Sequence, residues 1–103
     1  MSPEVAAAEA RQRPRLAVSL SAQLRQAGGV RLDADIHDLS ETGFRADCLY
    51  GIAVGTRVFL TIPTFTPMEA SVAWRAGSQH GCHFLRPLYP AVFDTIVARY
   101  QRA

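Results

Sequence analysis

The alternation that indicates the fold lies in residues 16–25, which read LAVSLSAQLR. Every second residue from Leu16 to Leu24 is apolar, and the residues between them are small, polar or charged. A period of two is typical of a β-strand that buries one face and exposes the other. The run therefore predicts a half-buried strand, and it is the clearest strand signal in the chain.

A second strand follows after a short turn. Residues 26–29 read QAGG, which suits a turn, and the alternation then resumes over residues 30–37. The apolar set of this second run is Val30, Leu32, Ala34 and Ile36. Two alternating runs joined by a short turn that contains glycine are typical of an antiparallel hairpin.

A third alternating run covers residues 44–48. Its inward set is Phe44, Ala46 and Cys48. Successive side chains of a strand point to opposite faces, so Arg45 is expected on the solvent face. A loop with two glycines follows over residues 49–56.

Three further strands are predicted beyond this loop. The first ends at Pro63, the second covers residues 69–75 and the third covers residues 80–85. Their inward residues are Val58, Leu60 and Ile62, then Ala70, Val72 and Trp74, and finally Cys82 and Phe84. Six short strands with one apolar face each favour a closed or split antiparallel barrel over an open sheet with exposed edges.

The hydrophobic period changes after Pro90 to that of an amphipathic helix. The apolar residues of this segment are Val92, Phe93, Ile96, Val97 and Tyr100, and Pro90 is tolerated in a first helical turn. We therefore expect an all-β fold with a C-terminal helix that forms a lid on the barrel. One domain is expected over residues 11–103, preceded by a flexible segment at residues 1–10 that is too short to form a stable helix alone.

Between the second and third strands lies the hexapeptide DLSETG, residues 38–43. It combines a carboxylate, a hydroxyl and a glycine in one tight turn. We expect Asp38 and Ser40 to bond to nearby backbone amides, and Gly43 to adopt a positive φ. Such a turn presents hydrogen-bond acceptors and donors on the barrel surface.

Three arginines, Arg11, Arg13 and Arg15, precede the first strand. Pro14 disfavours helix at the residue before it, so this segment is expected to form an extended, mobile arm. Taken alone, the cluster is typical of a solvated basic tail. An arginine guanidinium also offers paired donors for a phosphate or a guanine edge, which makes the cluster a candidate anion site.

Charge and composition narrow the classes of function. The net charge of +2 over 103 residues argues against extensive nucleic-acid coating, and the local arginine cluster better suits a small anion. No apolar run reaches the roughly 18 residues that a membrane span needs, and the first residues lack the features of a signal peptide, so we expect a cytoplasmic location without membrane insertion. The two cysteines, Cys48 and Cys82, are expected to be reduced packing residues.

Catalytic and metal sites are disfavoured, and we expect no enzyme, no metal and no cofactor. Ser40 with His37 and Asp38 lacks a nucleophile elbow and a third orienting group. Strand alternation sends His83 to the face opposite His80 and Cys82, which leaves at most two convergent metal ligands; we expect these histidines to be exposed strand residues.

A barrel that binds single-stranded nucleic acid would need outward aromatic residues among basic ones, and only Phe59 clearly offers that.

The two polar segments together resemble the signatures of the PilZ family of cyclic di-GMP receptors. The family pattern R-x-x-x-R falls on Arg11 and Arg15, and [D/N]-x-S-x-x-G falls on Asp38, Ser40 and Gly43. The second pattern is the more informative, because a chain with eleven arginines contains R-x-x-x-R readily by chance. The resemblance extends over about residues 9 to 100 and implies a six-stranded barrel.

The resemblance also implies a binding site for cyclic di-GMP, a bacterial second messenger. Asp38, Ser40 and Gly43 would line one side of the ligand, and Arg11 and Arg15 would close over it from the arm. Arg13 and Arg45 are secondary candidates. We expect a receptor that changes the conformation of its arginine arm on binding and signals to an unidentified partner protein. The alternative is an adaptor of the same family that binds a protein and not the nucleotide. Whether one ligand molecule binds or a stacked pair stays open.

Overall fold

The computed structural model describes residues 15–101, which form six strands and one helix. The elements in chain order are β1 (Leu16–Gln26), β2 (Arg31–Leu39), β3 (Gly43–Cys48), β4 (Arg57–Thr61), β5 (Met68–Ala76), β6 (Gln79–Phe84) and α2 (Pro90–Tyr100). No helix among these residues has the length and apolar character needed to cross a membrane.

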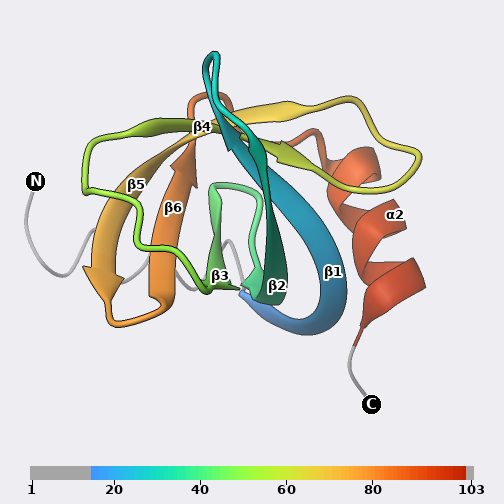
Figure 1. The fold of residues 1–103 in the computed structure, drawn as a ribbon. Helices are drawn as coiled ribbons and strands as arrows, with labels where there is room; N and C mark the ends of the chain where they lie inside the picture. Colours follow the sequence, from blue (N-terminus) through green and yellow to red (C-terminus); the bar gives the residue numbers. More distant parts are fainter. Residues whose placement is uncertain (1–14, 102–103) are drawn as a thin grey trace, which may run out of the picture.

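The strands form a closed antiparallel barrel in the order β1-β2-β3-β6-β5-β4, with α2 beside β1 (Figure 1). The β1–β2 hairpin runs from the Leu16↔Leu39 pair to the Arg25↔Arg31 pair, and β1 closes the barrel by pairing Gln23–Gln26 with β4. This confirms the expected six-stranded antiparallel barrel with a C-terminal helix.

Most of the predicted inward residues fill the barrel, but Val30 lies before the start of β2 and is 77% exposed. Leu24, Phe44 and Leu60 are fully buried, and the Phe44 and Phe84 rings pack with their centroids 5.2 Å apart. Each fully buried side chain of this size stabilises the fold by roughly 1.5–3 kcal/mol. Buried residues alternate with outer ones along most of each strand, so many outer side chains are available to contact other molecules.

Helix α2 covers the part of the barrel that β4 leaves open. β1 pairs with β4 only over its last residues, so within residues 15–101 its first half has no strand neighbour on that side except for a bridge from Val18 to Gln101. The helix buries Phe93, Ile96 and Val97, and Pro90 stands at its start. The predicted amphipathic helix and its role as a lid are therefore confirmed.

The expected inward position of Trp74 is wrong. The pairing of β5 with β6 shifts register between Val72 and Trp74, so Ala73 is an extra residue at this point. A β-bulge of this kind reverses the alternation of side chains. Trp74 consequently lies on the outer face of the barrel with 40% of its surface exposed.

The expectation that His80 is exposed is also wrong, whereas His83 is exposed as expected. His80 is fully buried, and its Nε2 accepts a hydrogen bond from the backbone N–H of Ile52 at 3.0 Å. Its Nδ1 lies 2.8 Å from the carbonyl oxygen of Ser78, so the proton of the neutral ring belongs on Nδ1. His80 thus fastens the β3–β4 loop, which buries Ile52, to the start of β6.

Candidate functional site

Asp38 reaches the outer face of the barrel through a second bulge. β2 pairs Ile36 with Ala46 and then Asp38 with Arg45, which leaves His37 as an extra residue. Without this bulge, strict alternation from the buried Ile36 would turn Asp38 toward the core. The bulge instead places Asp38 outward and the next residue, Leu39, fully inside.

The carboxylate of Asp38 is held by Arg45 on the neighbouring strand. Arg45 donates from Nε to Oδ2 of Asp38 at 2.8 Å, and its Nη1 donates to Oε1 of Gln79 on β6 at 3.1 Å. Arg45 therefore lies on the solvent face near the hexapeptide, as predicted. The chain of side chains joins β2, β3 and β6 across the outer surface.

Arg15 approaches the other carboxylate oxygen. Its Nε lies 3.5 Å from Oδ1 of Asp38, with half of the Arg15 side chain exposed and only 16% of the Asp38 side chain exposed. Ala17 of β1 pairs with Asp38, and Arg15 comes two residues before Ala17, so the two share a face of the extended chain. The strand register therefore brings Arg15 close to Asp38. The structure thus brings together Arg15, Asp38 and Arg45. The other two arginine candidates, Arg11 and Arg13, lie outside the described residues.

Oδ1 of Asp38 is inaccessible to solvent and has no hydrogen-bond partner within residues 15–101. Arg15 stands at ion-pair distance from it without the geometry of a hydrogen bond. Buried polar atoms in folded proteins are nearly always hydrogen-bonded, and one without a partner calls for an explanation. This oxygen can accept a further hydrogen bond once the atoms that cover it move aside.

Ser40 builds the turn instead of projecting from it. Its Oγ accepts hydrogen bonds from the backbone N–H groups of Thr42 at 3.2 Å and Gly43 at 3.1 Å, and the side chain is almost completely buried. Its own N–H donates to the carbonyl of Gly43 at 2.8 Å. The expected bonding of Ser40 to nearby amides is confirmed. For Asp38 the expectation is wrong, because the carboxylate accepts its hydrogen bond from the Arg45 side chain.

Gly43 is required for a reason other than the one predicted. Among the glycines of residues 15–101, positive φ angles occur at Gly28, Gly55 and Gly77 and not at Gly43, so the expected left-handed conformation is wrong. A Cβ atom at Gly43 would collide with the carbonyl oxygen of Cys82 on β6. The glycine therefore permits the close approach of two strands at the end of the turn.

The remaining backbone of the hexapeptide is fixed from the other side. Phe84 donates its N–H to the carbonyl of Thr42 at 2.9 Å, and Leu88 donates to the carbonyl of Glu41 at 2.8 Å. The turn is therefore held by β6 and by the segment that leads into α2. A site built on such a turn is preorganised before any ligand arrives.

Gln79 and Trp74 belong to the same outer surface and were not among the predicted site residues. Arg45 pairs with Gly81 of β6, and Gly81 pairs with Trp74 of β5, so the four residues Asp38, Arg45, Gly81 and Trp74 form one row across four strands. This row follows from how the strands pair, which depends on the bulges in β2 and β5. The alternation of apolar and polar residues in the sequence does not reveal these bulges.

The cysteines offer no site chemistry. Cys48 and Cys82 are both buried free thiols, as expected. Burial raises the pKa of Cys82 to about 12, which leaves it an unreactive neutral thiol near pH 7. No group of three or more histidine, cysteine or acidic side chains among residues 15–101 could hold a metal ion.

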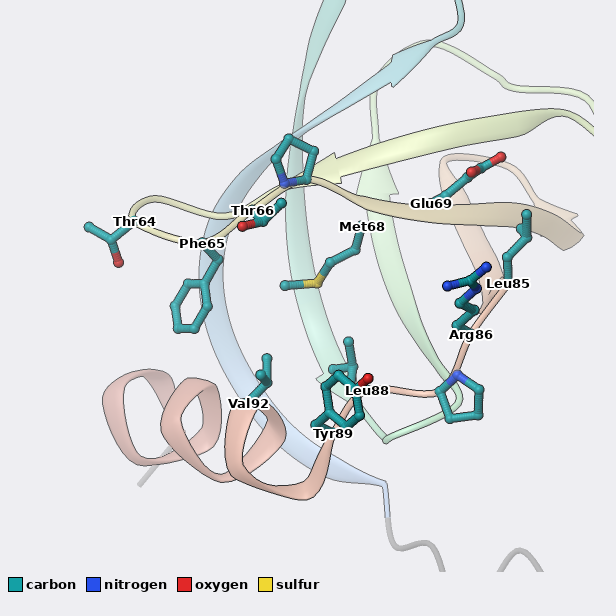
Figure 2. A pocket seen from close by; sticks show the side chains of 12 residues that line it. Thr64, Phe65, Thr66, Met68, Glu69, Leu85, Arg86, Leu88, Tyr89 and Val92 are labelled. Atoms are coloured by element: carbon teal, nitrogen blue, oxygen red, sulfur yellow. The ribbon is translucent and has the colours of Figure 1, made fainter.

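A separate groove of about 650 Å³ lies between the β4–β5 loop and the segment that precedes α2 (Figure 2). Figure 2 shows the side chains of Phe65, Met68 and Val92 pointing toward one another from the two sides. Neither Asp38 nor Arg45 lines it. The groove and the Asp38 row are thus two distinct features of the surface.

The outer face of this small closed barrel thus carries an oriented carboxylate, two arginines and a rigid serine–glycine turn. The model of one family, the PilZ domain, matches residues 9–100. The chain therefore belongs to the PilZ domain family, which is a family of cyclic di-GMP-binding domains. None of the curated proteins compared with the chain matches it.

Proposed function

We propose that this protein is a receptor that binds cyclic di-GMP on the outer face of the barrel at Asp38 and its neighbouring arginines. The observation that carries the proposal is the state of Asp38. Its carboxylate is held outward by a bulge, with Oδ2 bonded to Arg45 and Oδ1 buried without a hydrogen-bond partner in the described residues. Membership of the PilZ family supports the same ligand class.

The chemistry of cyclic di-GMP fits these groups. Guanine presents N–H donors on its Watson–Crick edge, which a carboxylate accepts, and O6 and N7 acceptors on its other edge, which an arginine fork can grip. The two phosphates carry negative charge that Arg15 and Arg45 would compensate. Arginine suits both targets because its planar guanidinium forms two parallel hydrogen bonds.

Each contact of Asp38 has a separate role in this proposal. Arg45 is held by Gln79 as well as by Asp38, so it stays hydrogen-bonded to Oδ2 and fixes the plane of the carboxylate. Arg15 is half exposed and lies farther away, so it is the residue that turns from Oδ1 toward a ligand phosphate. Oδ1 of Asp38 then accepts a hydrogen bond from an N–H group of guanine. Ser40 and Gly43 act by holding the turn in place.

The N-terminal arginines complete the proposed receptor. Arg11, with Arg13 as a secondary contact, would close over the ligand from the arm, and the change in this arm would be the signal read by a partner protein. The proposed role is binding and signalling, without catalysis. Two aromatic residues are weak candidates for contact with this partner: Phe59, which lies under the guanidinium of Arg25 at 5.0 Å, and Phe65, which lines the groove.

One observation favours the alternative, an adaptor that binds a protein and not the nucleotide. In the free protein Asp38 already has two arginine neighbours, so its charge is compensated without a ligand. An adaptor would keep this pairing as a structural feature of the surface.

Titration calorimetry with cyclic di-GMP separates the two functions. The receptor is expected to bind the dinucleotide, and Asp38→Ala is expected to weaken binding by at least tenfold because a buried charged acceptor is lost. Asp33→Ala, a change at an exposed carboxylate elsewhere on β2, is the matched control and should leave the affinity unchanged. Absence of binding by the unmodified protein would favour the adaptor.

A further inference from the structure

One wall of the groove in Figure 2 is the β4–β5 loop, which α2 holds in place. Thr64 of this loop has a φ of 72°, a left-handed conformation that branched residues rarely adopt. Arg99 of α2 donates from Nη1 to the hydroxyl of Thr64 at 2.7 Å, and its guanidinium lies over the Phe65 ring at 5.3 Å. The helix therefore keeps Phe65 at the edge of the groove although the backbone beside it is strained.

The other wall is the segment that leads into α2, and it is fastened to the hexapeptide and to β5. Leu88 donates its N–H to the carbonyl of Glu41 at 2.8 Å, and Leu85 donates to the carbonyl of Glu69 at 3.0 Å. Leu88 and Val92 pack against the core but stay only partly buried. The groove volume of about 650 Å³ falls within the range of about 300–1,000 Å³ in which pockets accommodate bound groups. The groove is therefore a preformed apolar cleft.

The groove carries positive charge at both ends. Figure 2 shows Phe65 and Arg86 at opposite ends of it, and Arg99 lies over Phe65. Within residues 15–101 neither Arg86 nor Arg99 forms an ion pair with a carboxylate. Glu69, the acidic residue of the lining, pairs with Arg57 at 3.2 Å. The groove thus suits an apolar segment that carries two carboxylates.

The first ten residues of the chain have this composition. They read MSPEVAAAEA, with carboxylates at Glu4 and Glu9, apolar residues between them and no basic side chain. A helix of this length is marginal in water and depends on packing against another surface for its stability. The segment therefore complements the groove in both charge and apolar character.

The chain before β1 is long enough to reach the groove. Leu16 pairs with Leu39, and Glu41, two residues later, is bonded to Leu88. With about 5 Å across each pair and about 7 Å along two residues, Leu16 lies within roughly 17 Å of Leu88. The six residue steps from Leu16 back to Ala10 span about 20 Å when extended. Ala10 can therefore reach the end of the groove where Leu88 and Arg86 lie.

We propose that residues 1–10 of this chain dock in the groove between the β4–β5 loop and α2. Because the segment enters at the Leu88 end, Glu9 pairs with Arg86, and Glu4 lies farther along toward Arg99. The linker of residues 11–14 stays outside the groove and passes the hexapeptide. This inference goes beyond the receptor function and does not depend on a nucleotide. A partner protein that contacts Phe65 has to displace the docked segment first.

A spin label on the full chain tests the docking in the absence of any ligand. Ser2→Cys provides the attachment site, because the native thiols of Cys48 and Cys82 are buried. In NMR spectra of the labelled protein, a docked segment should broaden the backbone amide resonances of Phe65 and Leu88. Reduction of the label should restore these resonances.

Gly77 provides the internal control for this measurement. It lies in the turn between β5 and β6, on the side of the barrel away from α2 (Figure 1), and its amide resonance should stay sharp. Broadening of Gly77 equal to that of Phe65 and Leu88, or no broadening at these two residues, would overturn the docking. Either result would leave the proposed nucleotide site untouched, because no nucleotide is present.

A charge exchange tests the pairing of Glu9 with Arg86 in the same labelled protein. Glu9→Arg and Arg86→Glu should each reduce the broadening at Leu88, and the double variant should restore it. Arg31→Glu, a change at an exposed arginine at the start of β2, is the matched control and should have no effect. Unchanged broadening in both single variants, failure of the double variant to restore it, or an equal loss in Arg31→Glu would overturn the pairing.

Discussion

Arg45 and Asp38 face each other across β3 and β2, and Nε of the arginine donates to Oδ2 of the carboxylate at 2.8 Å. The pair lies on the outer face of the barrel, with 38% of the Arg45 side chain and 16% of the Asp38 side chain exposed. It orients the carboxylate while leaving Oδ1 without a hydrogen-bond partner in the described part of the chain. The proposed binding of the ligand at Asp38 depends on this orientation.

Arg45→Ala is expected to weaken binding of cyclic di-GMP by about 1 kcal/mol, because the carboxylate loses the hydrogen bond that fixes its plane. Half-exposed ion pairs stabilise proteins little, so the free energy of unfolding should fall by no more than about 1 kcal/mol. Arg57→Ala breaks an ion pair with Glu69 of 3.2 Å and serves as the control for a general effect of losing an arginine. Calorimetry should show a loss of affinity only for Arg45→Ala, and equal losses for both variants would refute the specific role.

Arg11→Ala and Arg15→Ala should each lower the binding free energy by about 1–3 kcal/mol, since each removes a guanidinium that grips a phosphate or a guanine edge. Arg25→Ala should cost little, because Arg25 stacks over Phe59 away from the Asp38 row. Binding isotherms and melting curves are needed for all three variants. If thermal stability falls as much as affinity does, the arginines are structural and the assignment is wrong.

Gly43→Ala should destabilise the fold by about 1–3 kcal/mol or more, because the added methyl group collides with the carbonyl oxygen of Cys82 and pushes β3 away from β6. Gly29→Ala is a suitable comparison, since a Cβ there meets its nearest atom, the carbonyl oxygen of Gln26, only at 3.3 Å. Urea unfolding of both variants measures the difference. A Gly43→Ala protein as stable as the unmodified one would contradict the close approach of the two strands.

Ligand binding should protect the arginine arm from proteolysis. Trypsin is expected to cut after Arg11 readily in the free protein and slowly with saturating cyclic di-GMP, because a doubly anionic ligand compensates the repulsion among the arginines and orders the segment around it. The rate at which the cleaved product accumulates is the readout. Unchanged cleavage at a concentration that saturates binding would show that the signal passes through another element.

The strands of this protein are predictable because their apolar residues alternate without interruption over most of their length. The predicted strand at residues 16–25 corresponds to Leu16–Gln26 in the structure, and the inward positions of Phe44 and Phe84 are correct. Arg45 was placed on the correct face because β3 is regular from Phe44 to Cys48. Local periodicity is sufficient wherever the pairing register does not shift.

Side-chain alternation does not predict which residues face outward at the bulges of β2 and β5, nor which polar groups are buried. The extra residues His37 and Ala73 reverse the alternation, and they determine which face carries Asp38 and Trp74. The burial of His80 depends on a backbone N–H from a loop 28 residues away, which no local pattern indicates. The close approach at Gly43 likewise depends on a strand that comes much later in the chain. These features arise from strand pairing between distant parts of the chain. The bulge at His37 and the close approach at Gly43 shape the proposed site.

The most direct test of the receptor is a comparison of cyclic di-GMP with cyclic di-AMP and GTP by titration calorimetry on the full chain. Guanine offers the N–H donors that Asp38 accepts and the O6 and N7 acceptors that an arginine grips, whereas adenine offers a different pattern, so binding of cyclic di-GMP should be at least tenfold tighter than that of cyclic di-AMP. GTP, with one base and a different arrangement of phosphates, should also bind more weakly. Equal affinity for the two cyclic dinucleotides, or no binding of cyclic di-GMP, would contradict the account.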